Sequence, residues 1–242
     1  MKNRRDFLKS AGLAAGTFTL AGTVPGCTPV SDQAKSWKRM PLVLRYKPYE
    51  LKLKHVFTLS SSSRTTTPVI LTELEWNGII GYGEASLPPY LVETQDSVTQ
   101  FLSKLDLSPY TNPFLLEDIQ DYVDRSAPGN HAAKASFDIA LHDLAGKLIG
   151  QPWYKMWGLN PEKTPNTSFT IGIDTPDVVK GKVKEAEVYK ILKVKLGRGT
   201  DKEMIEAVRS VSDVPVCVDV NQGWTDKVMA LEMCKWLAGR SE

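Results

Sequence analysis

The order of apolar and polar residues changes character near residue 150. From residue 40 to about residue 86, apolar residues alternate with polar ones in short runs, which is the period of half-buried strands. These strand-like runs lie at 42–44, 51–53, 68–76 and 79–84. Apolar residues at helical spacing follow at 93–105, 114–125 and 131–149. Strands followed by helices predict an α+β domain over residues 40–150.

A turn and a loop are predicted inside the strand-rich part. Asn77 and Gly78 separate two alternating runs, and this dipeptide is a strong signal for a two-residue hairpin turn. Residues 60–67 contain only serine, threonine and Arg64, with no apolar anchor. We therefore expect residues 60–67 to form a mobile loop.

After residue 165, strand-like and helical patterns alternate. Strands are expected at 167–173, 191–196 and 214–220, and helices at 176–189, 201–211 and 226–238. This rhythm predicts parallel strands in a sheet or a TIM-type barrel, so residues 151–242 read as the first part of a (β/α) barrel. Three such units would leave long sheet edges and a half-covered core. We expect from this that the sequence is a truncated part of a longer enzyme.

The beginning of the chain has a pattern of its own. Two arginines precede a weakly apolar stretch over residues 10–24, and the arrangement over residues 1–27 resembles a twin-arginine export signal. The stretch is too short to favour a permanent membrane span. Cys27 ends a segment that is similar to a lipoprotein processing box, which makes it the expected lipidation site, with residues 28–39 as a linker. We expect an exported protein, periplasmic or membrane-anchored through the lipid; the alternative is the amphipathic start of a cytosolic enzyme.

Composition and charge narrow the class of protein. The 242 residues are 42% hydrophobic and 24% charged, a globular composition that excludes a disordered chain. The net charge of +2 is spread along the chain without a basic stripe, so we expect no nucleic-acid partner. Cys217 and Cys234 lie in apolar patterns and are expected in the core, and neither a zinc spacing nor a disulfide framework is visible.

The second and third predicted barrel strands carry the candidate chemistry. Lys193 and Lys195 share one face of the second strand, and Asp219 and Asn221 share one face of the third. Parallel neighbours bring such side chains to the same carboxyl-terminal rim, where α/β folds place active sites. A second ammonium group nearby weakens the preference of a lysine for its charged form, so Lys195 is a candidate base near neutral pH. Asp219 is a candidate oxygen ligand for Mg²⁺.

This combination of groups suits one kind of reaction. A base beside a divalent cation can remove a proton from the carbon next to a carboxylate, and the cation together with Lys193 can stabilise the enolate that forms. Simpler interpretations stay open. Lysines also protect edge strands from aggregation, and a carboxylate such as Asp219 also caps helices.

Lys193-Val194-Lys195 and Asp219-Val220-Asn221, at successive strand ends behind an α+β domain, resemble the enolase superfamily. The similarity is to its muconate-lactonising subgroup and most of all to the dipeptide epimerases. It spans residues 40–238 and implies a capping domain followed by a barrel. It also implies that Lys195 is the acid/base at the substrate carbon and that Lys193 contacts the substrate carboxylate. Asp219 is then the first ligand of Mg²⁺, and Asn221 lies beside the metal site.

The resemblance also implies residues that contact the substrate. Thr170, in the first barrel strand, matches a substrate-contacting threonine, although a threonine also suits any strand. Residues 60–67 match the loop that closes over the substrate. Ser61 replaces the arginine with which some relatives hold a glutamate side chain, and Arg64 is close enough to substitute for it, or is a surface residue only.

The function implied by the resemblance is that of an isomerase. It would epimerise a dipeptide or an N-acyl amino acid, a small-molecule substrate, by Mg²⁺-assisted proton transfer through an enolate. If the protein is exported, its expected substrate is a peptide released from the cell wall. Its only expected contact with a membrane is the lipid anchor. Whether it forms a homo-oligomer is left open. The alternatives are a cycloisomerase or an o-succinylbenzoate synthase-like lyase of the same superfamily, and a non-catalytic truncated lipoprotein.

Overall fold

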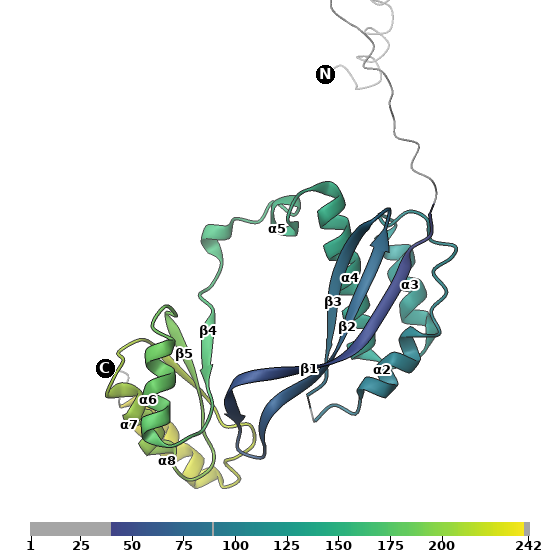
Figure 1. Ribbon diagram of the computed structural model, residues 1–242. Helices are drawn as coiled ribbons and strands as arrows, with labels where there is room; N and C mark the ends of the chain where they lie inside the picture. The colour runs from purple at the N-terminus through teal and green to yellow at the C-terminus, as the bar shows by residue number, and fades with distance from the viewer. Residues whose placement is uncertain (1–39, 89, 240–242) are drawn as a thin grey trace, which may run out of the picture. The chain divides into compact units, whose positions relative to one another are not determined.

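The computed structural model describes residues 40–88 and 90–239 (Figure 1). The predicted export signal, the linker over 28–39 and the lipidation site Cys27 lie outside these residues. Within them, an antiparallel sheet with helices comes first, and alternating parallel strands and helices follow. The capping domain and the incomplete barrel predicted from the sequence are therefore confirmed.

The first sheet is a meander of three strands. It consists of β1 (Val43–Thr58), β2 (Ser63–Trp76) and β3 (Ile79–Ser86), paired antiparallel in that order. The predicted turn is confirmed, because Trp76 pairs with Ile79 and both residues between them have positive φ, 49° at Asn77 and 79° at Gly78. Positive φ at both central positions is the conformation that matches the twist of two paired strands.

The predicted loop over residues 60–67 is wrong in its extent. Ser63 pairs with Thr58 and Arg64 with Phe57, so β2 begins inside the expected loop. The following threonines are β-branched and suit a paired strand, which the polar composition of the segment concealed. The hairpin tip, defined as residues 58–62, is closed by a hydrogen bond of 2.8 Å from Leu59 N to Ser62 O.

Three helices accompany this sheet, α2 (Gln95–Leu102), α3 (Leu116–Ser126) and α4 (His131–Ile149). Helix α4 lies against β3 so closely that a Cβ on Gly81 would be 2.1 Å from the carbonyl oxygen of Ala140. Phe137 and Leu141 of α4 are fully buried in the core that this contact creates. The short helices α5 (Trp153–Met156) and η1 (Pro161–Lys163) lead out of the domain.

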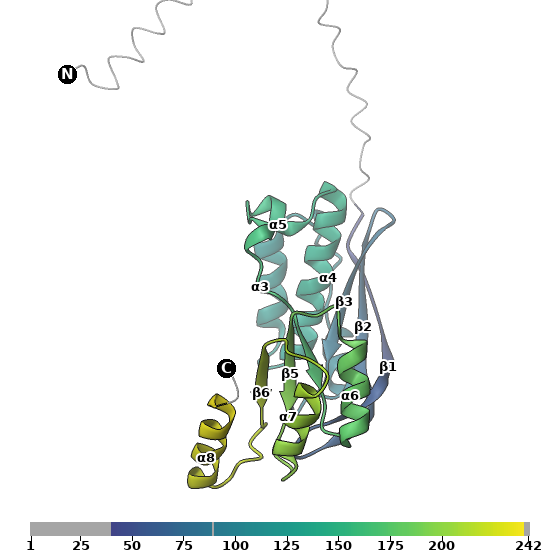
Figure 2. The ribbon, with the colours of Figure 1, turned by 90° about the vertical axis from the view of Figure 1, so that its left-hand side faces the viewer.

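The second part repeats a strand and a helix three times. Its elements are β4 (Ser168–Ile171), α6 (Pro176–Glu185), β5 (Ile191–Lys195), α7 (Asp201–Arg209), β6 (Val216–Asp219) and α8 (Lys227–Ala238). The strands are parallel in the order β4-β5-β6, and α6 and α7 cover one face of the sheet (Figure 2). Leu192 and Val194 of β5 are buried, so the apolar face of the strand packs under the helices. The opposite face is left for the polar residues.

Both cysteines of the described residues differ from their prediction. Cys217 and Cys234 are exposed, not part of the core. Strand β6 is the outer one of the three strands that the described residues pair in this sheet, and Cys217 is the register partner of the partly exposed Lys193. Among the described residues, no helix has both the length and the apolar character needed to cross a membrane.

Candidate active site

The register of the parallel strands aligns the candidate residues. The Cα atom of Lys195 is the partner of that of Asp219 across β5 and β6, and Thr170 is the partner of Lys193 across β4 and β5. Partners in a parallel pair point to the same face of the sheet. The three strand ends therefore present one polar cluster.

The structure brings four predicted residues into contact. Lys195 Nζ lies 2.7 Å from Asp219 Oδ2 and 2.7 Å from Asn221 Oδ1. Lys193 Nζ lies 2.9 Å from the same Asp219 Oδ2. The side chain of Lys195 is 8% exposed, whereas that of Lys193 is 37% exposed. The predicted meeting of two ammonium groups and one carboxylate is confirmed in its geometry.

A tight turn after β6 holds the acidic residue in place. Asn221 and Gln222 have φ of 41° and 62°, and Gly223 N donates to Val220 O at 2.7 Å, which closes the turn. The backbone N–H of Asn221 donates to Asp219 Oδ1 at 3.0 Å. Residues other than glycine seldom adopt this conformation, so the turn stores strain next to the cluster. Its effect is to direct the side chain of Asn221 back to Lys195.

The charges of the cluster stabilise one another. Hydrogen bonds from Lys195 and then Lys193 hold the pKa of Asp219 well below its usual range. The hydrogen bond to Asp219 raises the pKa of Lys193. At Lys193 this hydrogen bond outweighs burial, which acts to lower the pKa, so the carboxylate between the two lysines favours the charged form of Lys193.

A cavity of about 670 Å³ opens above the cluster. Lys195, Asn221 and Gln222 line it from the barrel segment, and the capping domain contributes Phe57, Leu59, Ser61, Ser62, Arg64, Pro88 and Tyr90. The guanidinium carbon of Arg64 stands 5.4 Å from the centre of the Phe57 ring. Nε of Arg64 is buried, and no described residue accepts a hydrogen bond from it. Both Arg64 and Ser61 thus face the same cavity as Lys195.

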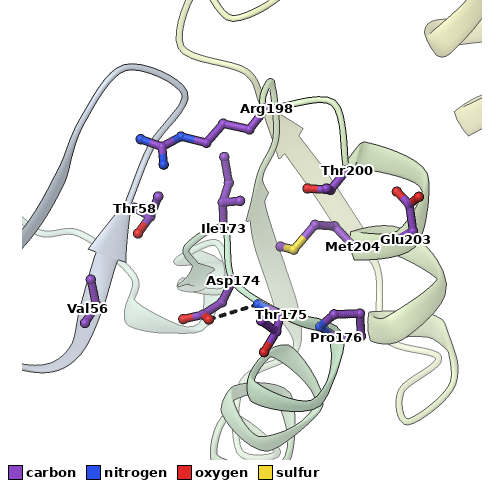
Figure 3. A pocket seen from close by; sticks show the side chains of 10 residues that line it. All are labelled: Val56, Thr58, Ile173, Asp174, Thr175, Pro176, Arg198, Thr200, Glu203 and Met204. Atoms are coloured by element: carbon purple, nitrogen blue, oxygen red, sulfur yellow. Dashed lines mark hydrogen bonds between the residues drawn. The ribbon is translucent and has the colours of Figure 1, made fainter.

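A second cavity, also of about 670 Å³, lies beside the first barrel units (Figure 3). It runs between Val56 and Thr58 of β1 and the beginnings of α6 and α7. None of the four clustered residues lines it. We therefore place the candidate chemistry in the cavity above Lys195.

The oxygen atoms in the cluster fit part of a Mg²⁺ site. Asp219 and Asn221 offer a carboxylate and an amide oxygen, the hard ligands that Mg²⁺ prefers. No group of three or more metal-binding side chains occurs among the described residues. The described residues therefore offer two oxygen atoms of the kind that Mg²⁺ binds.

Residues that the sequence interpretation missed support the cluster. The buried carboxylate of Asp201 accepts hydrogen bonds of 2.7 Å from Gly197 N and from Trp224 Nε1. It thereby joins the loop after β5 to the segment after β6. Arg198 and Ser60 make a further contact between the barrel segment and the hairpin tip. The glycines at 197 and 199 around Arg198 were the visible signal of an unusual loop.

Comparisons with known proteins agree with this architecture. Residues 46–158 match the family model "Mandelate racemase / muconate lactonizing enzyme, N-terminal domain". The chain is 56% identical to the L-Ala-D/L-Glu epimerase of Bacteroides thetaiotaomicron over 98% of its own length and 63% of that protein. It is 36% identical to an L-Ala-D/L-amino acid epimerase of Pedosphaera parvula, over 81% of the chain and 58% of the relative.

A solved structure with the same fold comes from Cytophaga hutchinsonii. It is a dipeptide epimerase complexed with Mg and the dipeptide D-Ala-L-Val. The TM-score is 0.68 at 28% identity, over 83% of this chain and 56% of the other. The chain thus spans less than two thirds of the length of these relatives.

Proposed function

This chain belongs, through residues 46–158, to the mandelate racemase / muconate lactonizing enzyme family, and from that premise we propose that the whole protein epimerises a dipeptide. The observation that carries the proposal is the contact of Lys193 and Lys195 with one carboxylate oxygen of Asp219, beneath a cavity. The relatives named above are epimerases of dipeptides and support the same reaction. An N-acyl amino acid has the same kind of reacting carbon, the one next to the carboxylate. It is therefore a second class of substrate to test together with dipeptides.

Lys195 is the proton-transferring residue in this proposal. Its ammonium group lines the cavity, and its side chain is almost fully buried, so a substrate that fills the cavity would meet this amine where bulk water is excluded. Lys193, which is more exposed, offers a cation to the substrate carboxylate. In this proposal Lys195 transfers the proton, and Lys193 binds the carboxylate of the substrate.

Asp219 and Asn221 are proposed to supply oxygen ligands of a Mg²⁺ ion in the whole protein. Mg²⁺ stabilises negative charge that develops on a carboxylate next to the reacting carbon. The carboxylate of Asp219 is a hard oxygen ligand of the kind that Mg²⁺ prefers, and it stands at the end of β6 beside both lysines. Its Oδ1 atom is fixed by the N–H of Asn221.

Thr170 and Arg64 are proposed to contact the substrate. Thr170 lies opposite Lys193 on β4 and is only partly buried. Arg64 faces the cavity with a buried donor that has no acceptor among the described residues, so a carboxylate of the substrate would satisfy it. We extend the proposal to location: the twin-arginine pattern and Cys27 support an exported, lipid-anchored protein acting on peptides of the cell wall.

Deuterium exchange tests the proposed reaction. The whole protein, with Mg²⁺, is incubated in D₂O with a set of dipeptides and N-acyl amino acids, and products are followed by NMR and chiral chromatography. We expect deuterium at one α-carbon together with inversion at that carbon. Absence of exchange into every compound of the set would refute the proposal. Deuterium incorporation that depends on Lys195 but gives a cyclised or dehydrated product would show the cycloisomerase or lyase alternative.

A further inference from the structure

Three glycines stand where the three barrel strands end. Gly172 follows β4, Gly197 follows β5 and Gly223 follows β6. A Cβ on Gly172 would lie 3.1 Å from Thr58 N of the hairpin tip. A Cβ on Gly197 or Gly223 would lie 3.2 or 2.8 Å from the Cβ of Ser60. The hairpin tip therefore rests on the three strand ends. A residue larger than glycine at any of these three positions would push the tip away.

Hydrogen bonds complete this seat at the first and third strand ends. Ile173 N, directly after Gly172, donates to Thr58 O at 3.1 Å. Ser60 Oγ donates to the carbonyl oxygen of Asn221 at 2.8 Å. Asn221 belongs to the strained turn that also positions Asp219, so the hairpin tip touches the backbone of the catalytic cluster.

Arg198 holds the hairpin tip from the second strand end. Its Nε donates to Ser60 O at 3.1 Å and its Nη2 to Ser62 O at 3.3 Å. Figure 3 shows the Arg198 side chain extending from the barrel segment toward the hairpin that carries Val56 and Thr58. Hydrogen bonds from a charged guanidinium are stronger than those between neutral groups, and two of them from one fork fix an orientation.

The seat determines the shape of the cavity above Lys195. Leu59, Ser61 and Ser62 of the hairpin tip line that cavity. If the tip lifted, the cavity would lose one wall, while Lys195 and Asp219 would stay in contact through their own strands. The position of the tip therefore affects substrate binding more than proton transfer.

We propose that Gly172, Gly197 and Gly223 form a seat for the hairpin tip, and that Arg198 is a positioning residue that keeps the tip seated and so sets KM for the substrate. The inference rests on the proposed function only for the identity of that substrate. The docking itself follows from contacts within the described residues.

Amide exchange and kinetics on the same variants test this inference. Arg198→Met keeps most of the length of the side chain and removes both hydrogen bonds to the tip. We expect the amides of Leu59 and Ile173, which are bonded within and to the tip, to exchange about tenfold faster or more by hydrogen–deuterium exchange mass spectrometry. In the whole protein we expect KM to rise about tenfold with kcat changed less than about threefold.

Matched variants separate docking from general damage. Gly172→Ala places a methyl group against the backbone of Thr58 and should also speed exchange at the tip, whereas Gly181→Ala meets nothing within 4 Å and should not. Lys190→Met removes an exposed cation on the same part of the chain and serves as the control for Arg198→Met. Both controls should keep the exchange rates and KM of the unaltered protein.

Each possible result bears on a different part of the proposal. Faster exchange at the tip with a higher KM supports the proposal, and unchanged exchange in Arg198→Met overturns it. Faster exchange with an unchanged KM overturns the role in substrate binding. If the unaltered protein acts on no dipeptide or N-acyl amino acid, the proposed function fails, and the exchange rates still decide whether Arg198 and the glycines dock the tip.

Discussion

Lys195 and Asp219 are partners across β5 and β6, and their side chains meet at 2.7 Å on the rim of the cavity. The pairing follows from backbone register, since the Cα atoms of these two residues are aligned across the parallel strands whatever their side chains are. A small molecule in the cavity would therefore meet an amine whose position is fixed by two strands.

Replacing Lys195 with arginine should abolish proton transfer and leave the fold intact. Arginine keeps the positive charge beside Asp219 but does not release a proton under physiological conditions. We expect deuterium incorporation into the substrate to fall by about a hundredfold or more, measured by NMR. Lys190→Arg, on an exposed residue just before β5, should leave the rate unchanged. A Lys195→Arg protein with the full rate would remove Lys195 from the mechanism.

The alternation of side chains predicted this cluster because the period of a strand acts over a few residues. Lys193 and Lys195 share a face for that reason, and the polar residues after β6 follow the same rule. The contact between Ser60 and Asn221 was not predictable in this way. It joins residues 161 positions apart. It also depends on glycines that lie next to Ser60 in the folded chain but far from it in the sequence.

Local composition also misled the interpretation in identifiable ways. Residues 63–67 look like a loop by polarity, but pairing with β1 makes them a strand, and pairing is a property of two segments together. Cys217 looks like a core residue by its apolar neighbours, yet it is exposed on β6, the outer one of the three parallel strands among the described residues. Which strand lies at the edge depends on how many strands pair, which a local pattern does not contain.

Asp219→Asn should destabilise the fold at neutral pH. The substitution keeps the shape of the side chain and leaves two ammonium groups without the carboxylate they share. We expect the free energy of unfolding to fall by about 1–2 kcal/mol near pH 7, because the pair is only partly buried and solvent screens it. Urea denaturation followed by circular dichroism measures the change. Asp213→Asn, at an exposed site, should change stability by less than about 0.5 kcal/mol.

The difference between the unaltered protein and Asp219→Asn should depend on pH in both directions. The lowered pKa of Asp219 contributes stability that is present above the carboxyl's ordinary value, ~3.9, and is lost as pH falls through its folded value. The raised pKa of Lys193 contributes stability that is present below about 10.4 and is lost as pH rises through its folded value. The difference should be largest between about pH 5 and pH 9. Unfolding curves with a constant difference from about pH 2 to about pH 12 would contradict this coupling.

Asp201→Asn should loosen the connection between the loop after β5 and Trp224. The buried carboxylate accepts hydrogen bonds from two N–H donors. An asparagine side chain has only one acceptor oxygen, so its NH₂ group would face one of those two N–H groups. We expect a loss of about 1–3 kcal/mol in unfolding free energy. A change in the fluorescence of Trp224 should accompany it, which a Trp224→Phe background would identify. Unchanged stability and fluorescence would show that the two hydrogen bonds to the Asp201 carboxylate contribute little to this connection.

Arg64→Met should change the choice of substrate more than the rate of the reaction. The methionine retains apolar contact with Phe57 and removes the buried donor that faces the cavity. We expect kcat/KM for L-Ala-L-Glu to fall about tenfold relative to L-Ala-L-Leu, since only the former carries a side-chain carboxylate. Competition between the two dipeptides in one reaction measures the ratio directly. An unchanged ratio would make Arg64 a structural residue.

Gly81→Ala should damage the capping domain without touching the active-site cluster. A Cβ at this position would lie 2.1 Å from the carbonyl oxygen of Ala140 and 2.5 Å from the nitrogen of Leu144, both in the backbone of α4. Backbone atoms of a helix cannot turn aside as a flexible side chain can, so the helix must move away from β3. We expect a loss of about 1–3 kcal/mol in unfolding free energy, measured by urea denaturation. Gly181→Ala, in open space on α6, should be neutral or slightly stabilising because alanine favours a helix. Equal stability of the two variants would mean that α4 and β3 are not packed as closely as these contacts require.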